Sequence, residues 1–226
     1  MLQAIIFDFD GVIADSEPLH LRAYQAVLEP EGISLTREDY YAKYLGFDDS
    51  GLFRALAGDL GIAVTDDKVD NWVDAKSVII EQLLMNDEIL FPGAAACVQS
   101  LARRYPMAIA SGALAPEIEL VLEHSGLSNC FKTISSASDG VRGKPAPDLY
   151  LLAVAKLLDF AQIDARNCVA IEDSRWGLEA AKRAGLKTVA VTHTYAAAEL
   201  AGADLIVERL CDITVSRLEE LFTEVR

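Results

Sequence analysis

The chain has 226 residues, of which 52% are hydrophobic and 24% are charged, so it can bury the core of one large domain or two smaller ones. Its 35 acidic residues outnumber its 20 basic residues and give a formal net charge of −15. This charge argues against nucleic acid as a partner, because binding to phosphate backbones needs clustered lysine and arginine, and it disfavours anionic membrane surfaces.

Short apolar runs alternate with helical patterns along most of the chain. Strands buried on both faces are predicted at 4–7, 107–110, 168–171, 188–191 and 205–207. Helices are predicted at 94–104, 116–125, 147–158 and 175–184, and Gly126 and Gly185 stand where helix C-terminal caps are expected. This alternation predicts an α/β fold in which helices cover both faces of a parallel sheet, in three layers.

The segment 16–89 interrupts this alternation. It shows helical patterns at about 18–28, 37–44, 51–60 and 66–84, and no strand. We therefore predict an all-helical domain at 16–89, inserted into a core domain formed by 1–15 and 90–226. The insertion holds 15 acidic and 6 basic residues, so it is the more acidic of the two parts.

The chain shows no membrane or redox signature. No apolar stretch approaches the roughly 20 residues that span a bilayer, and the N-terminal run lacks the basic start of a targeting segment. The four cysteines are far apart, with no C-x-x-C pair, which is typical of free thiols in a reducing compartment. A cytoplasmic protein with no membrane partner, either a monomer or a weak homo-oligomer, is expected.

Polar side chains occur where the predicted strands end, at the edge where ligands bind to parallel sheets. These residues are Asp8, Asp10, Ser111, Gly112, Glu172 and Asp173, and Lys144 lies in a loop before a helix. Taken singly, each is more simply explained as a turn or a helix cap. Taken together, four carboxylates at one edge would be costly without a metal ion or another balancing charge.

Phosphoryl transfer is the chemistry that fits these residues. A carboxylate can attack phosphorus, and a cation must then reduce the repulsion between the two anions. Hard carboxylate oxygens favour Mg²⁺ as that cation. Asp8 and Asp10 leave the strand on the same face if it stays extended, so one can attack while the other handles the proton of the leaving group.

Four motifs resemble those of the haloacid dehalogenase superfamily, in the same order. They are Asp-Phe-Asp-Gly-Val from Asp8, Ala-Ser-Gly around Ser111, Gly-Lys-Pro-Ala-Pro-Asp around Lys144, and Ile-Glu-Asp-Ser around Asp173. The helical insertion resembles the C1 cap of the β-phosphoglucomutase and phosphoglycolate phosphatase branch. The resemblance therefore covers nearly the whole chain and implies a Rossmann-like core with a helical cap.

The resemblance also implies a role for each matching residue. Asp8 would be the nucleophile that forms an aspartyl-phosphate, and Asp10 would protonate the leaving group and then activate water. Ser111, the Gly112 amide and Lys144 would bind the phosphoryl group. Mg²⁺ would be held by Asp8, by the carbonyl of Asp10, by Asp173 and by Glu172.

The second aspartate of the first motif argues against two of the activities found in the superfamily. Dehalogenases and phosphonate hydrolases of the superfamily lack the acid that is present here as Asp10. A sugar phosphomutase needs basic groups for a second phosphate, but the expected cap loop at 46–51 carries Asp48 and Asp49, and Arg54 is the only nearby cation. We therefore expect a phosphatase of a small phosphomonoester, such as a sugar phosphate or similar metabolite, with a β-phosphoglucomutase-like mutase as the alternative.

Four residues of the helical cap are candidates for contacts with the substrate: His20, Asp48, Asp49 and Arg54. His20 could contact substrate or lie on the surface of the first cap helix. Asp48 and Asp49 could face the substrate or cap the helix predicted from Gly51.

Overall fold

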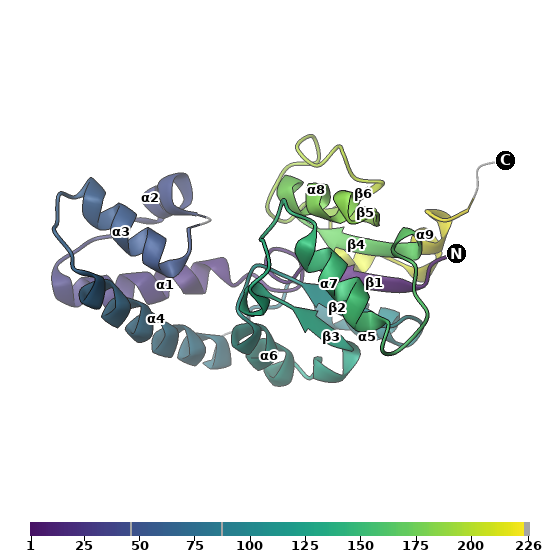
Figure 1. Cartoon of the computed structure of the whole chain (residues 1–226), viewed down its shortest axis with the longest axis horizontal. Coiled ribbons are helices and arrows are strands. Elements are labelled where there is room, and N and C mark those ends of the chain that lie inside the picture. The colour runs from purple at the N-terminus through teal and green to yellow at the C-terminus, as the bar shows by residue number, and fades with distance from the viewer. Residues whose placement is uncertain (46, 87, 224–226) are drawn as a thin grey trace. The chain divides into compact units, whose positions relative to one another are not determined.

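The computed structural model describes residues 1–45, 47–86 and 88–223, and its chain divides into two compact units (Figure 1). An α/β unit consists of Met1–Asp15 and Ile89–Arg226, and a helical unit consists of Ser16–Glu88. The predicted boundaries lie at the same place on the N-terminal side and one residue later on the C-terminal side.

The α/β unit is built on a six-stranded parallel sheet with the strand order β3-β2-β1-β4-β5-β6. The strands are β1 (Ala4–Phe7), β2 (Met107–Ala110), β3 (Thr133–Ser135), β4 (Cys168–Glu172), β5 (Lys187–Val191) and β6 (Leu205–Val207). Every residue of β1, β2 and β4 is buried, which explains their continuous apolar sequences. The sequence analysis missed β3, because this short, partly exposed edge strand has no apolar run.

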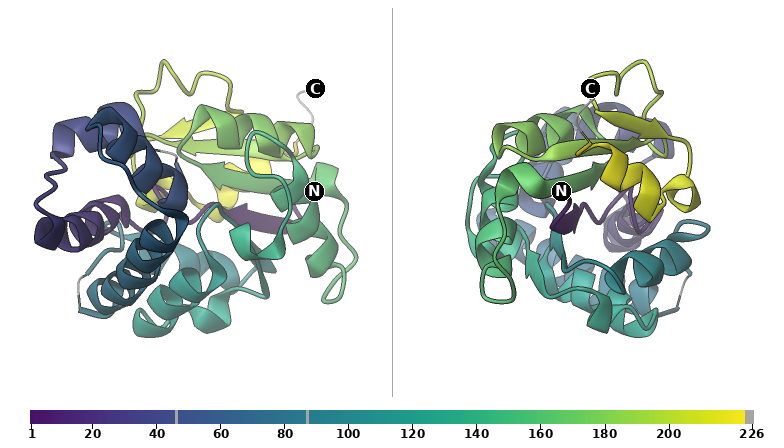
Figure 2. Two further views of the ribbon diagram at one scale, coloured as in Figure 1. Left: turned by 60° about the vertical axis from the view of Figure 1, so that its left-hand side comes forward. Right: turned by 90° about the vertical axis from the view of Figure 1, so that its right-hand side faces the viewer.

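Helices cover both faces of this sheet, as predicted (Figure 2). On one face lie α7 (Asp148–Leu157) and α8 (Arg175–Arg183), whose buried side chains pack against alternate residues of the strands, including Ile6 and Ala170. On the other face lie α5 (Ala94–Ala102) and α6 (Ala115–His124). The last described helix is α9 (Val215–Glu220). The predicted α/β fold is therefore confirmed.

The register of the central strands places two acidic side chains next to each other. Phe7 of β1 pairs with Ile171 of β4, and the amide of Asp8 donates to the Ile171 carbonyl at 2.9 Å. Asp8 and Glu172 are thus neighbours across the two strands. Because side chains alternate along a strand, both lie on the same face as Ile6, which is the face covered by α7 and α8.

The helical unit contains α1 (Glu17–Leu28), α2 (Arg37–Asp39), which continues as a wider helical turn at Tyr40–Tyr44, α3 (Asp49–Asp59) and α4 (Asp66–Asn86). The structure describes no strand in this unit. Its core is rich in aromatic residues, with Tyr24, Tyr40, Phe53 and Trp72 packed together. No helix in the described part of the chain combines the length and the apolar character that crossing a membrane requires.

The two segments that lead to and from the helical unit are hydrogen-bonded to each other within the α/β unit. The amide of Asp15 donates to the carbonyl of Ile89 at 2.8 Å, and the amide of Phe91 donates to the carbonyl of Ile13 at 3.0 Å. The ring of His193 stacks on Phe91, and its Nδ1 lies 3.0 Å from the carbonyl oxygen of Gly11. These contacts fix both segments close to the end of β1.

Candidate active site

A buried lysine joins the two acidic residues that the register brings together. Lys144 precedes α7, and its Nζ lies 2.7 Å from Oδ2 of Asp8 and 2.6 Å from Oε1 of Glu172. Asp8 is 7% exposed and Glu172 is fully buried. The cation therefore balances two carboxylates that have lost most of their hydration.

Both carboxylate oxygens of Glu172 accept hydrogen bonds from protein groups. Its Oε1 accepts from Lys144 and from the phenol of Tyr150, which lies 2.6 Å away. Its Oε2 accepts from the amides of Asp173 and Ser174, at 3.2 Å and 3.4 Å, and from the Ser174 hydroxyl. Burial and the nearby charge of Glu172 raise the pKa of Tyr150, so the phenol keeps its proton and remains a donor.

Asp173 completes a group of acids that could hold a metal ion. Asp8, Glu172 and Asp173 each offer a carboxylate oxygen, and these oxygens lie within 4.8 Å of one another. Burial and the charge of Glu172 raise the pKa of Asp173 to about 6, although a hydrogen bond from Thr194 opposes the shift. Three close carboxylates with one lysine leave an excess of negative charge, which a divalent cation would neutralise.

The pKa values of the central ion pair are both raised. Burial, and then the charge of Glu172, raise the pKa of Asp8 well above its usual value, although Lys144 opposes the shift. Burial alone would lower the pKa of Lys144, but the charges of Asp8 and Glu172 outweigh it and hold that pKa above the usual value. Lys144 is therefore a permanent cation beside Asp8.

Asp10, Ser111 and Gly112 lie at the same edge of the sheet. The hydroxyl of Ser111 lies 3.5 Å from Oδ2 of Asp10, and it also accepts from the amide of Ala113 at 3.1 Å. Ser111 is buried, whereas Gly112 is exposed and has open space around it. The structure thus brings together Asp8, Asp10, Ser111, Lys144, Glu172 and Asp173, and places Gly112 next to Ser111.

Two glycines leave room for these carboxylates, and the sequence analysis did not identify either role. A Cβ on Gly177 in α8 would lie 1.9 Å from the carboxylate of Glu172. A Cβ on Gly11 would lie 2.0 Å from Oδ2 of Asp173, and Gly11 also has a positive φ of 74°. The early position of Gly177 in a predicted helix, where glycine is unfavourable, was the available signal.

The predicted cap residues have structural partners inside the helical unit. Asp48 is the N-cap of α3 and accepts from the amide of Gly51 at 2.7 Å. Asp49 accepts from the phenol of Tyr24 and forms an ion pair of 3.0 Å with Lys76, a lysine that is only 2% exposed. The capping alternative therefore describes Asp48, and Asp49 instead balances a buried cation.

Lys76 is a further residue that the sequence analysis missed. It lies on the buried stripe of α4, between Trp72 and Ile80, so the helical spacing was a usable signal.

The other predicted cap residues also have local explanations. Arg54 pairs with Asp66 at 2.7 Å on the surface. Burial and the charge of Lys76 lower the pKa of His20 to about 4, so His20 is neutral at pH 7. The predicted cap loop begins at Gly46, which lies outside the described residues.

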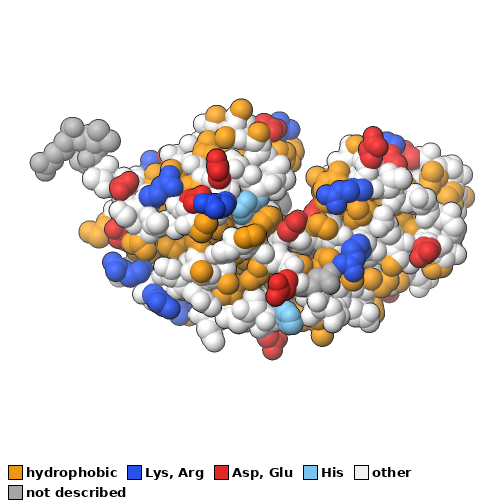
Figure 3. All heavy atoms as spheres, turned by 180° about the vertical axis from the view of Figure 1, so that it is seen from behind, with side chains coloured by type: hydrophobic (Ala, Val, Ile, Leu, Met, Phe, Trp, Pro, Cys, Tyr) orange, Lys and Arg blue, Asp and Glu red, His pale blue; other side chains and the backbone are white. Residues whose placement is uncertain are grey.

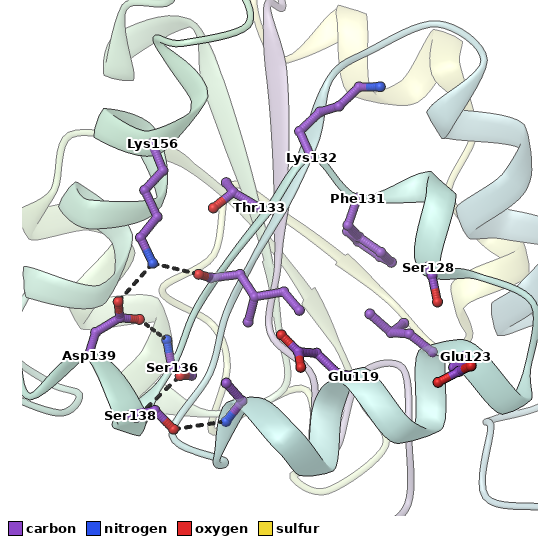
Figure 4. Close-up of a pocket in the computed structure, with 13 residues that line it drawn as sticks. Glu119, Glu123, Ser128, Phe131, Lys132, Thr133, Ser136, Ser138, Asp139 and Lys156 are labelled. Atoms are coloured by element: carbon purple, nitrogen blue, oxygen red, sulfur yellow. Dashed lines mark hydrogen bonds and ion pairs between the residues drawn. The ribbon is translucent and has the colours of Figure 1, made fainter.

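A separate cavity of about 530 Å³ lies at the open edge of the sheet, beside β3 and α6 (Figure 4). Its Lys156 donates to the carbonyl of Ile134 at 2.7 Å and to Asp139 at 2.8 Å. None of the acids grouped around Lys144 lines it. On the face shown in Figure 3, lysine and arginine side chains are scattered among acidic and apolar ones.

Comparison with known proteins identifies the family. A family model described as haloacid dehalogenase-like hydrolase matches residues 2–185, which is most of the chain. The chain belongs to the haloacid dehalogenase-like hydrolases. This confirms the resemblance drawn from the four motifs, all of which lie within the matched residues.

Two relatives of this haloacid dehalogenase-like hydrolase and one solved structure are 27–29% identical to it in sequence. Fructose-1-phosphate phosphatase YqaB of Escherichia coli is 28% identical over 187 residues, covering 83% of this chain and 95% of that protein. Beta-phosphoglucomutase of Bacillus subtilis is 29% identical over 228 residues, covering 100% and 97%. The crystal structure of CbbY from Rhodobacter sphaeroides in complex with phosphate superposes with a TM-score of 0.83, at 27% identity, covering 97% of this chain and 100% of that one.

These similarities confirm that the chain is an enzyme of the predicted class, a phosphoric monoester hydrolase, with the predicted Rossmann-like fold.

The close approach of Gly177 to Glu172 predicts a destabilising substitution. Gly177→Ala should lower the free energy of unfolding by about 1–3 kcal/mol, because its Cβ would displace a buried carboxylate. Gly58→Ala is the matched control: it also lies in a helix, but no atom is within 4 Å of its Cβ, so it should raise stability by up to about 1 kcal/mol. Urea unfolding followed by circular dichroism measures both. Equal effects of the two variants would contradict the steric argument.

The N-cap position of Asp48 predicts a stability effect. Asp48→Ala should lower the free energy of unfolding by about 1 kcal/mol. Asp48→Ser should keep most of the stabilisation by the cap, because a serine side chain also accepts a hydrogen bond from an amide in the first turn of a helix. The same unfolding measurement tests this. Unchanged stability of Asp48→Ala would contradict the capping role, and loss of turnover by Asp48→Ser at full stability would make Asp48 a substrate contact as well as a cap.

Proposed function

We propose that this enzyme is a Mg²⁺-dependent phosphatase that hydrolyses a small phosphomonoester through an aspartyl-phosphate on Asp8. The observation that carries the proposal is the position of Lys144, within 2.7 Å of Asp8 and 2.6 Å of Glu172, at the sheet edge that also holds Asp10, Ser111 and Asp173. A buried carboxylate with an adjacent cation can approach an anionic phosphate, which an uncompensated carboxylate could not do.

The donor set fits a hard divalent cation. Carboxylates of Asp8 and Asp173 and the carbonyl of Asp10 would hold Mg²⁺, which prefers oxygen ligands and keeps several waters. When bound, the ion would neutralise charge on the phosphoryl oxygens. Because both oxygens of Glu172 already accept from protein groups, we assign this residue to holding Lys144, although it was also predicted as a ligand.

In the proposed reaction, the chain's own residues move one phosphoryl group and one proton at each step. A carboxylate oxygen of Asp8 attacks phosphorus, the ester P–O bond breaks, and Asp10 gives a proton to the leaving oxygen. Asp10 then takes a proton from water as that water attacks phosphorus, and inorganic phosphate leaves with Asp8 restored. Ser111, the amide of Gly112 and Lys144 bind the phosphoryl oxygens throughout.

Two ion pairs in the helical unit support a phosphatase rather than a phosphomutase. A mutase must hold a second phosphate with cations, but Arg54 pairs with Asp66 and Lys76 pairs with Asp49. Like the acidic composition of this unit, these pairs disfavour a doubly phosphorylated substrate. In this proposal, residues 1–15 and 90–226 form the catalytic domain and residues 16–89 form a C1-type cap domain.

A sugar phosphate is the substrate class that the relatives favour. The similarity to a fructose-1-phosphate phosphatase covers most of both chains. The similarity to a beta-phosphoglucomutase covers the whole chain, so mutase activity is the second candidate. A screen of sugar monophosphates that scores both inorganic phosphate and isomerised sugar phosphate separates the two. Isomerised product without release of phosphate would favour the mutase.

The nucleophile predicts the first kinetic experiment. Asp8→Asn should lower the hydrolysis of an aryl phosphate by at least about three orders of magnitude, because an amide cannot form the phosphoenzyme. Asp159→Asn, at an exposed position, is the matched control and should leave turnover unchanged. The release of inorganic phosphate with and without Mg²⁺ measures both. Full activity of Asp8→Asn, or of the wild type in EDTA, would overturn the mechanism.

The raised pKa of Asp173 predicts how metal binding depends on pH. Below about pH 6 a proton occupies this carboxylate, and Mg²⁺ must displace it. The affinity for Mg²⁺ should therefore fall several-fold as the pH is lowered from 6 to 5, because Asp173 and Asp8, whose pKa is also raised, bind the ion only when deprotonated. Isothermal titration calorimetry without substrate measures this affinity. An affinity independent of pH from 5 to 8 would remove Asp173 from the ligand set.

A further inference from the structure

The phenol of Tyr150 belongs to the Lys144 network, and the roles implied by the four motifs do not include it. Tyr150 lies in α7, is fully buried, and donates to Oε1 of Glu172 at 2.6 Å. The Nζ of Lys144 lies 5.3 Å from the centre of its ring. A buried phenol therefore meets both the lysine and the glutamate, and its single O–H donates a hydrogen bond to Glu172.

Two donors converge on the same oxygen of Glu172. Lys144 and Tyr150 both lie 2.6 Å from Oε1, and the other oxygen accepts from the segment that begins at Asp173. An ionised carboxylate has about four lone-pair sites, so these contacts leave little freedom for the group to rotate. Tyr150 is therefore one of the contacts that determine where Oε1 lies.

The position of Oε1 matters because Lys144 is shared between two acids. An oxygen that already accepts from a phenol attracts an ammonium group less strongly than one that does not. Without the phenol, Glu172 would draw Lys144 toward itself and away from Asp8, which lies 2.7 Å from Nζ. The hydrogen bond from Tyr150 thus favours the shared position.

We propose that Tyr150 is a positioning residue, which acts through Glu172 to keep Lys144 on Asp8. The effect on turnover rests on the proposed function, because only there is Asp8 the nucleophile. The position of Lys144 itself does not rest on the proposed function and can be measured separately.

The test is Tyr150→Phe, which keeps the ring and its packing and removes only the O–H. Tyr105→Phe is the matched control, because Tyr105 also donates to a glutamate, Glu219, at 2.6 Å. Tyr105 precedes β2, so it lies at the amino ends of the strands, away from the Lys144 network. We expect kcat of Tyr150→Phe on an aryl phosphate to fall about tenfold, the effect of one hydrogen bond to a charged group, with KM unchanged within about twofold. Tyr105→Phe should keep the wild-type kcat.

Two measurements without turnover distinguish positioning from a general structural effect. The ¹H–¹⁵N signal of the Lys144 ammonium group, assigned with Lys144→Arg, should shift in Tyr150→Phe and stay in place in Tyr105→Phe. The affinity for Mg²⁺, from calorimetry without substrate, should stay within about threefold in both variants, since the phenol donates to Glu172 and not to an assigned ligand.

The outcomes are separable. An unmoved Lys144 signal, or a wild-type kcat in Tyr150→Phe, would overturn the role of Tyr150, and a parallel loss of Mg²⁺ affinity would place its effect at the metal site instead. If the wild type hydrolyses no phosphomonoester, the proposed function fails, and the Lys144 signal alone still decides whether Tyr150 positions the lysine.

Discussion

The contact of Lys144 with Asp8 and Glu172 is the interaction on which the rest of the site depends. Two acids on adjacent parallel strands face the same side of the sheet and are almost without water, so they would repel each other strongly. Lys144 reduces this repulsion, but one cation cannot balance the acids that surround it once Asp173 is included. The remaining negative charge makes the sheet edge suited to a divalent cation. In the proposed function, that cation and Lys144 would together make the edge suited to a phosphate.

The surrounding structure serves to hold these charges in place. Tyr150 and the backbone after β4 saturate Glu172, while Gly177 leaves the space that its carboxylate occupies. Gly11 plays the same part for Asp173. These contacts come from the loops and helices that follow different strands. The carboxyl edge of a parallel sheet is where such segments meet, so the fold supplies the rigidity that preorganised electrostatic stabilisation requires.

The helical unit uses its charges differently. Its buried Lys76 is neutralised by Asp49, and Asp48 caps a helix, so the acids that stand out in its sequence have structural partners. The positive charge of Lys76 is thus used within the unit itself. The acids, lysine and serine that the proposed phosphate chemistry uses all lie in the α/β unit.

The amino-acid sequence predicts the parallel α/β fold, the helical insertion and the order of the acids, serine and lysine at the strand ends. It could do so because buried strands, helical spacing and strand-end motifs are local patterns. Three features emerge only from the folded chain: β3 forms an edge of the sheet, Tyr150 reaches Glu172, and Lys76 is buried against Asp49. Helical spacing can indicate that a tyrosine or lysine faces the core, but it does not show which charged group that side chain meets. Its partner is set by strand register and helix packing, which join residues far apart in the chain.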